Sequence, residues 1–94
     1  MIKKASFFLL FIAFSLQLGA TQLLVPMDNS QSNHLKAYGI AYWCLDNGVV
    51  IEWLLNYKGG AFLMPHLQEI ERELKIRGVK YQVLTDGQVS SVKS

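Results

Sequence analysis

The sequence predicts an exported α/β protein in which a partial parallel sheet of Rossmann-like or flavodoxin-like type follows a cleaved signal peptide. Two observations predict this fold class. Apolar segments of strand length alternate with segments of helical spacing, and the first twenty residues are apolar behind two lysines. Strands that alternate with helices are joined by right-handed crossovers into parallel sheets. The expected order is β-α-β-α-β, with a further helix beginning near the end of the chain.

The N-terminus carries the three parts of a secretory signal peptide. Lys3 and Lys4 form the positive start, residues 5–16 are apolar apart from two serines, and the small residues Gly19 and Ala20 precede the expected cleavage point. The apolar run is shorter than the ~20 residues that a membrane-spanning helix needs. We therefore expect the protein to be exported, to the periplasm or the extracellular space, and to meet the membrane only through this peptide during export.

The charge of the expected mature chain, residues 21–94, is balanced. Removing residues 1–20 takes away two of the nine Lys and Arg residues and none of the seven Asp and Glu residues, so the net charge falls from +2 to zero. Proteins that bind nucleic acid through its phosphates need an excess of positive charge, so no nucleic-acid partner is expected. Cys44 is the only cysteine, which excludes an internal disulfide, and no cluster of Cys and His residues indicates a metal site.

The first part of the mature chain is predicted as a strand, a polar loop and a helix. Residues 22–27 predict a short buried strand, and Ser32 or Asn33 can cap a helix over residues 34–47. Gly48 would close this helix in the left-handed conformation. The apolar residues expected to face the core share one side of the helix: Leu35, Tyr38, Ala41, Tyr42 and Leu45.

The alternation continues to the third strand. Residues 49–55 predict a strand whose nearly unbroken apolar character is typical of a parallel sheet covered on both faces. Residues 61–64 predict only a short extended piece, after which Pro65 suits the first position of a second helix. Residues 79–84 predict the third strand.

The last ten residues predict the start of a third helix, because Thr85 with Gln88 matches a capping box. Three strands and an interrupted helix make half of a doubly wound domain. We therefore expect residues 21–94 to be the N-terminal part of a truncated α/β domain. The alternative is a complete three-stranded mini-domain.

Ligands of open parallel sheets bind beyond the carboxyl ends of the strands. That rule selects the loops 28–34, 56–60 and 85–87. The residues predicted there to bind a small molecule are Asp28, Asn33, His34, Tyr57, Lys58, Gly59, Gly60 and Asp86. The pattern identifies no catalytic residue and no cofactor.

Each of these residues also has a structural interpretation. Asp28 could bind a ribose, a metal or an amine, or it could hold its own loop. His34 could be a general base or a ligand contact, or a surface histidine at the start of the helix. Residues 58–60 could cradle an anion or form a sharp turn, although they match neither a Walker A nor a Gly-x-Gly-x-x-Gly motif. Asp86 could belong to a site or begin a helix.

Cys44 lies late in a predicted helix, whereas a catalytic cysteine is usually activated on a strained turn or at a helix N-terminus. We therefore predict a packed apolar residue. The nearby aromatic residues are likewise predicted to belong to the core and not to a stacking platform: Tyr38, Tyr42, Trp43 and Trp53.

Three segments carry a family resemblance: residues 24–28 (Leu-Val-Pro-Met-Asp), residues 33–43 (Asn-His-Leu-Lys-Ala-Tyr-Gly-Ile-Ala-Tyr-Trp) and residues 53–60 (Trp-Leu-Leu-Asn-Tyr-Lys-Gly-Gly). The chain resembles, from about residue 23 to residue 87, the N-terminal region of exported bacterial proteins labelled asparagine synthetase B. Those proteins are several times longer, so the resemblance implies a fragment.

The motifs of the related activities are absent from the 94 residues. Glutamine-dependent asparagine synthetases use an N-terminal cysteine and a Ser-Gly-Gly-x-Asp-Ser loop, and class I amidotransferases use a Gly-x-Cys-x-Gly elbow. We therefore expect a non-catalytic binding or structural module. The rival hypothesis is a fragment of a glutamine-dependent amidotransferase or asparagine synthetase whose catalytic residues lie beyond Ser94. A third is a mistaken reading frame whose product does not fold alone.

Overall fold

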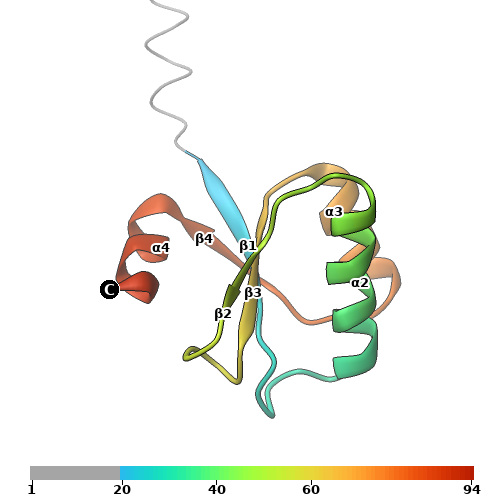
Figure 1. Ribbon diagram of the computed structural model, residues 1–94, viewed down its shortest axis with the longest axis horizontal. Helices are drawn as coiled ribbons and strands as arrows, with labels where there is room; N and C mark the ends of the chain where they lie inside the picture. The colour runs from blue at the N-terminus through green and yellow to red at the C-terminus, as the bar shows by residue number, and fades with distance from the viewer. Residues whose placement is uncertain (1–19) are drawn as a thin grey trace, which may run out of the picture.

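The computed structural model describes residues 20–94, which form four strands and three helices (Figure 1). The strands are β1 (Thr21–Val25), β2 (Glu52–Leu54), β3 (Ala61–Pro65) and β4 (Gln82–Thr85), and the helices are α2 (His34–Asp46), α3 (Gln68–Ile76) and α4 (Asp86–Lys93). The expected signal peptide falls, apart from Ala20, outside the described residues and stays a prediction.

The four strands form one antiparallel sheet in the order β2-β3-β1-β4. Leu24 pairs with Leu63 of β3 on one side and with Gln82 of β4 on the other, and Trp53 of the edge strand β2 pairs with Phe62. The predicted parallel sheet of Rossmann-like or flavodoxin-like type is therefore wrong.

The short segment 61–64 explains the difference, because it forms the central strand β3 instead of a minor extended piece. Residues 55–60 are too few for a crossover between parallel strands, so β2 and β3 pair as a hairpin and the chain reverses. Lys58, Gly59 and Gly60 make the reversal with φ angles of 47°, 74° and 93°. Glycine adopts such angles without the steric penalty that a Cβ atom brings.

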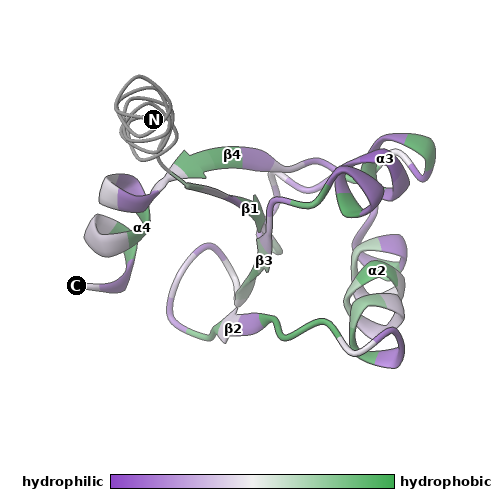
Figure 2. Cartoon of the chain, turned by 90° about the horizontal axis from the view of Figure 1, so that it is seen from above, coloured by the Kyte–Doolittle hydropathy of each residue, from purple (hydrophilic) through white to green (hydrophobic). Residues whose placement is uncertain are grey.

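The chain therefore follows the order β-α-β-β-α-β, in which each helix connects two strands that have another strand between them. This is the split β-α-β topology of ferredoxin-like folds. Helices α2 and α3 cover one face of the sheet, and α4 lies on the opposite face (Figure 2).

Alternating residues of the strands face two separate cores, as the pleat of a sheet requires. Leu23 and Val25 of β1 face α2 and α3, whereas Leu24 faces α4. The larger core also contains Ile40, Cys44, Phe62, Met64, Ile70 and Leu74, and the smaller one Ala61, Leu63, Leu84 and Val89.

Helix α2 packs on the sheet through a different side from the predicted one. Its buried residues are Ala37, Ile40, Ala41 and Cys44. Of the five residues that were predicted to face the core, Ala41 alone is buried, and the other four are exposed. Both sides of this helix are apolar, so the spacing of apolar residues alone does not show which side is buried. The side that packs on the sheet is the one with the smaller residues. Tyr38, Tyr42 and Trp53 are accordingly not core residues, whereas Cys44 is confirmed as a packed apolar residue.

The helix ends agree with the sequence in part. Asn33 caps α2 by accepting a hydrogen bond from the Lys36 amide, and the capping box of Thr85 and Gln88 is confirmed at the start of α4. Helix α3 instead begins at Gln68, because Pro65 is the last residue of β3.

Candidate functional site

The structure brings most of the predicted ligand-binding residues together at the carboxyl end of β1. The Met27 amide donates to the Lys58 carbonyl over 2.9 Å, which joins the loop after β1 to the β2–β3 hairpin. A Cβ atom on Gly59 would lie 2.8 Å from the backbone of Met27 and Asp28, so the two loops meet backbone against backbone. Residues 28–34 and 57–60 are therefore neighbours, although the sheet is antiparallel.

Most polar groups at this end are engaged in local hydrogen bonds. The Asp28 carboxylate accepts from the Ser30 amide and hydroxyl, and these bonds hold the pKa of Asp28 below its ordinary value, with a smaller contribution from the Lys58 charge. Nε2 of His34 lies 3.1 Å from the Met27 carbonyl oxygen and 2.9 Å from that of Asp28. Asn33 caps α2. These contacts close the loop upon itself.

Asp86 lies at the other end of the sheet. It is the first residue of α4, and the preceding Thr85 pairs with Thr21 at the beginning of β1. The prediction that Asp86 joins Asp28 in one site depended on parallel strands and is corrected by the antiparallel register. Tyr57 also points away from the loop after β1, since it packs against the core beneath α4.

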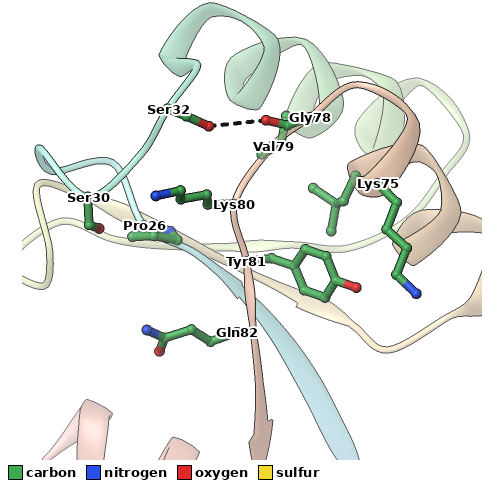
Figure 3. A pocket seen from close by; sticks show the side chains of 10 residues that line it. Pro26, Ser30, Ser32, Lys75, Gly78, Val79, Lys80, Tyr81 and Gln82 are labelled. Carbon is green, nitrogen blue, oxygen red and sulfur yellow. Dashed lines mark hydrogen bonds between the residues drawn. The ribbon is translucent and has the colours of Figure 1, made fainter.

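A pocket of about 590 Å³ lies beside the same loop, between residues 26–32 and the segment that leads into β4 (Figure 3). Figure 3 shows Lys75 beside the Tyr81 ring on one side, and Lys80 near Pro26 on the other. Its polar and charged lining residues are Ser30, Ser32, Lys75, Lys80, Tyr81 and Gln82. The pocket has room for a small molecule, and the sequence pattern indicated none of the last four residues.

Gln31 holds one wall of this pocket in place. Its side chain is 5% exposed, and its amide nitrogen donates to the carbonyls of Pro26 (2.9 Å) and Lys80 (3.0 Å). Its amide oxygen accepts from the backbone N–H of Lys80 over 2.9 Å. Gln31 thus pairs with Lys80 as a neighbouring strand would, and it links residues 49 positions apart in the sequence.

A second polar cluster lies at the amino end of β1. The Thr21 hydroxyl is 2.7 Å from Nδ1 of His66, and Nε2 of the same ring is 2.8 Å from a carboxylate oxygen of Glu71. The other oxygen of Glu71 accepts from the Tyr81 hydroxyl over 2.7 Å. We refer to these four residues as the Thr21 relay. Its members come from β1, the loop before α3, α3 and the segment before β4.

Hydrogen bonds within the Thr21 relay shift the pKa values of Glu71 and Tyr81 in opposite directions. The hydrogen bond from His66, followed by that from Tyr81, lowers the pKa of Glu71 below its ordinary value. Burial, together with the hydrogen bond to Glu71, raises the pKa of Tyr81 to about 12. Glu71 is therefore ionised and Tyr81 protonated at neutral pH, as their hydrogen bond requires.

The sequence pattern did not indicate this relay, because Thr21 and His66 are 45 positions apart. The Glu71 carboxylate in turn bonds Tyr81, which is ten positions away. Only the rarity of histidine, with two in the chain, could have drawn attention to His66.

A third candidate is the outer surface of α2. Four large apolar side chains along it are exposed, and we call them the α2 stripe: Leu35 (84%), Tyr38 (49%), Tyr42 (71%) and Leu45 (59%). Trp53 of β2 lies close by and is 56% exposed. Contiguous exposed apolar surface of this kind marks interaction sites in soluble proteins.

Comparison with known proteins gives no relative: no family model, no curated protein and no solved structure matches the chain. Within residues 20–94, no group of His, Cys, Asp and Glu side chains has an arrangement that could hold a metal ion. The helices of the same residues include none of sufficient length and apolar character to span a membrane.

Proposed function

We propose that the protein is an exported binding module that docks through the outer surface of α2 onto a helix of another polypeptide. The observation that carries the proposal is the α2 stripe, whose four large apolar side chains are 49–84% exposed. Each would bury apolar surface in a complex, and burial of such a side chain contributes about 1.5–3 kcal/mol. A role in docking requires no catalytic group on this surface.

The spacing of the stripe supports a helical partner. Residues 35, 38, 42 and 45 are separated by three, four and three positions, which is the spacing of the a and d positions in a coiled-coil seam. Such a seam packs its side chains into the spaces between those of a second helix. A partner that adds a strand to an edge of the sheet would have no use for this periodicity.

Aromatic contacts extend the surface from α2 to the edge of the sheet. Tyr38 meets Phe62 edge-to-face with ring centroids 5.8 Å apart, and Trp53 stacks on the same ring at 5.7 Å. The Trp53 indole nitrogen donates to the Gly60 carbonyl over 2.7 Å, which fixes the orientation of its exposed ring. Oriented tryptophan and tyrosine side chains are typical of residues that dominate binding energies.

The family resemblance bears on the origin of the helix that would cover the α2 stripe. Proteins labelled asparagine synthetase B are several times longer than this chain, and residues of a longer protein could provide the covering helix. The rival hypothesis, a fragment of an amidotransferase or synthetase, differs in the origin of that helix. In the rival case the helix belongs to residues beyond Ser94 of the same polypeptide.

A photo-reactive amino acid at position 42 tests the proposal in cells that export the protein. We expect one discrete cross-linked product, whose yield falls at least fivefold when Leu45→Glu is added. The same amino acid at position 72 is the control, because Arg72 is exposed on α3, away from the α2 stripe.

Peptide mapping of the cross-linked product then identifies the partner. A helical segment of another polypeptide, or of a second copy, supports the module. A segment encoded downstream of Ser94 supports the rival. Equal cross-linking from positions 42 and 72 would contradict both.

A further inference from the structure

We propose that the Thr21 relay is an acyl-transfer site in which the Thr21 hydroxyl is the nucleophile toward small carboxylic esters with apolar acyl groups. This activity goes beyond the docking role and belongs to another part of the molecule. The α2 stripe lies on the outer side of α2, whereas the relay joins the amino end of β1 to the start of α3.

The geometry provides a nucleophile, a base and a group that orients the base. His66 lies between the Thr21 hydroxyl, 2.7 Å from Nδ1, and the Glu71 carboxylate, 2.8 Å from Nε2. A carboxylate only accepts hydrogen bonds, so Nε2 of a neutral His66 carries the proton and Nδ1 is left as an acceptor. The Thr21 hydroxyl therefore donates to the nitrogen that can remove its proton. Hydroxyl, imidazole and carboxylate in this order are the arrangement that activates serine and threonine nucleophiles.

Tyr81 acts as a positioning residue. Its hydroxyl holds the second oxygen of Glu71 at 2.7 Å, and Lys75 adds a positive charge near the same carboxylate. Thr21 lies in β1 and Glu71 in α3, two elements that contribute to the larger core, and the base His66 is hydrogen-bonded to both residues. A base that is held by rigid elements keeps the distances that proton transfer requires.

The surroundings fit an ester with an apolar acyl group. His66 and Glu71 are 26% and 24% exposed, so the relay opens to solvent. Two exposed apolar side chains lie nearby: Leu67 follows His66, and Val83 shares the sheet face of Thr21 through the register of β1 and β4. Helix α3 begins beside His66 without a side-chain cap at Leu67. The first backbone N–H groups of α3 are the free donors nearest to His66 in the sequence. They would stabilise the negative charge that develops on the carbonyl oxygen of the ester.

The reaction balances with water as the second substrate. The Thr21 oxygen bonds to the ester carbonyl carbon while Nδ1 of His66 takes the hydroxyl proton. The carbon–oxygen bond to the alcohol then breaks, and the alcohol leaves with that proton. Water attacks the acyl-threonine ester with His66 again as the base, which releases the carboxylic acid and restores Thr21.

The test uses the full chain, exported from a bacterial host, with the N-terminus recorded by intact mass. The probe is p-nitrophenyl butyrate, and the background is the rate given by free imidazole at equal concentration. We expect hydrolysis above that background and a butyryl group on the peptide that contains Thr21. Thr21→Val and His66→Gln should each lower kcat/KM at least tenfold, whereas Thr21→Ser should retain activity.

Ser90→Ala is the control for loss of an exposed hydroxyl, because Ser90 lies on α4. It should leave kcat/KM unchanged. Tyr81→Phe should lower kcat and shift the acid limb of the pH profile, which loss of packing alone would not do. Absence of a butyryl group on Thr21 in the unaltered protein overturns the proposal, whatever the variants do. Hydrolysis that survives both Thr21→Val and His66→Gln also overturns it.

Discussion

The two ends of β1 carry polar clusters that the chain builds in opposite ways. At the carboxyl end, Asp28 and His34 bond groups within seven positions, and Gly59 brings the next loop against them by backbone contact. At the amino end, Thr21 and His66 are linked side chain to side chain across 45 positions. The first cluster depends on loop conformation, and the second depends on the register of the sheet. Polar residues that are near in sequence are thus used mainly for structure, whereas the chemically organised group is assembled over long range.

The largest expected effect tests the backbone contact at the carboxyl end. Gly59→Ala would place a Cβ 2.8 Å from Met27 and Asp28 at a φ of 74°, and it should lower the free energy of unfolding by about 3 kcal/mol. Gly48→Ala is the matched control, since its φ is 75° with open space around it, and it should lose only about 1 kcal/mol. Urea denaturation measures both. Equal losses would mean that the two loops do not meet as described.

Gln31 provides the next test, because its buried side chain links the carboxyl end of β1 to Lys80, 49 positions away. Gln31→Leu leaves Lys80 and Pro26 backbone groups without their partner, and it should cost about 2 kcal/mol of stability. Gln82→Leu replaces an exposed glutamine of β4 and should change stability by less than about 0.5 kcal/mol. A loss for Gln31→Leu no larger than that of Gln82→Leu would contradict the pairing with Lys80.

The smallest effect is a difference in acid sensitivity between the two ends. Folding lowers the pKa of Asp28 from its ordinary value of 3.8 and that of Glu71 from 4.5. As the pH falls below these ordinary values, each carboxylate therefore binds fewer protons in the folded protein than in the unfolded protein. Their contribution to stability is present above those values and is lost as the pH falls through the folded-state pKa. Glu71→Gln should flatten the acid side of the stability curve more than Asp28→Asn, because the Ser30 bonds of Asp28 are local enough to persist in the unfolded chain. Thermal melts between about pH 2 and pH 7 measure the two slopes, and the reverse order would contradict the comparison.

The sequence predicted the positions of most elements but not how they pair. Local signals identified the caps at Asn33 and Thr85, the helices and the left-handed Gly48 after α2, because these depend on neighbouring residues. The direction of the sheet depended on residues 61–65, whose few apolar positions do not distinguish a central strand from a loop. The buried side of α2 was equally ambiguous, since the helix is apolar on both sides.

The candidate sites follow the same division. The neighbourhood of Asp28, His34 and residues 58–60 could be predicted because they follow β1 and precede β3, which meet at one end in the antiparallel sheet as well. Asp86 could not be placed without knowing the direction of β4. The Thr21 relay required the register between β1 and β3, which pairs Gln22 with Pro65, and the turn before α3. No spacing in the sequence expresses either of them.

The protonation of His66 tests the central claim, that the amino end of β1 carries an organised relay, most directly. Nitrogen-detected NMR of the histidine rings at about pH 8.5, well above the ordinary histidine pKa of about 6.5, reports which nitrogen carries the proton. The account predicts a single form of His66 with the proton on Nε2, and a change of the Nδ1 shift in Thr21→Val while the His34 signals stay in place. A proton on Nδ1 of His66, or Nδ1 and Nε2 signals that do not respond to Thr21→Val, would contradict it.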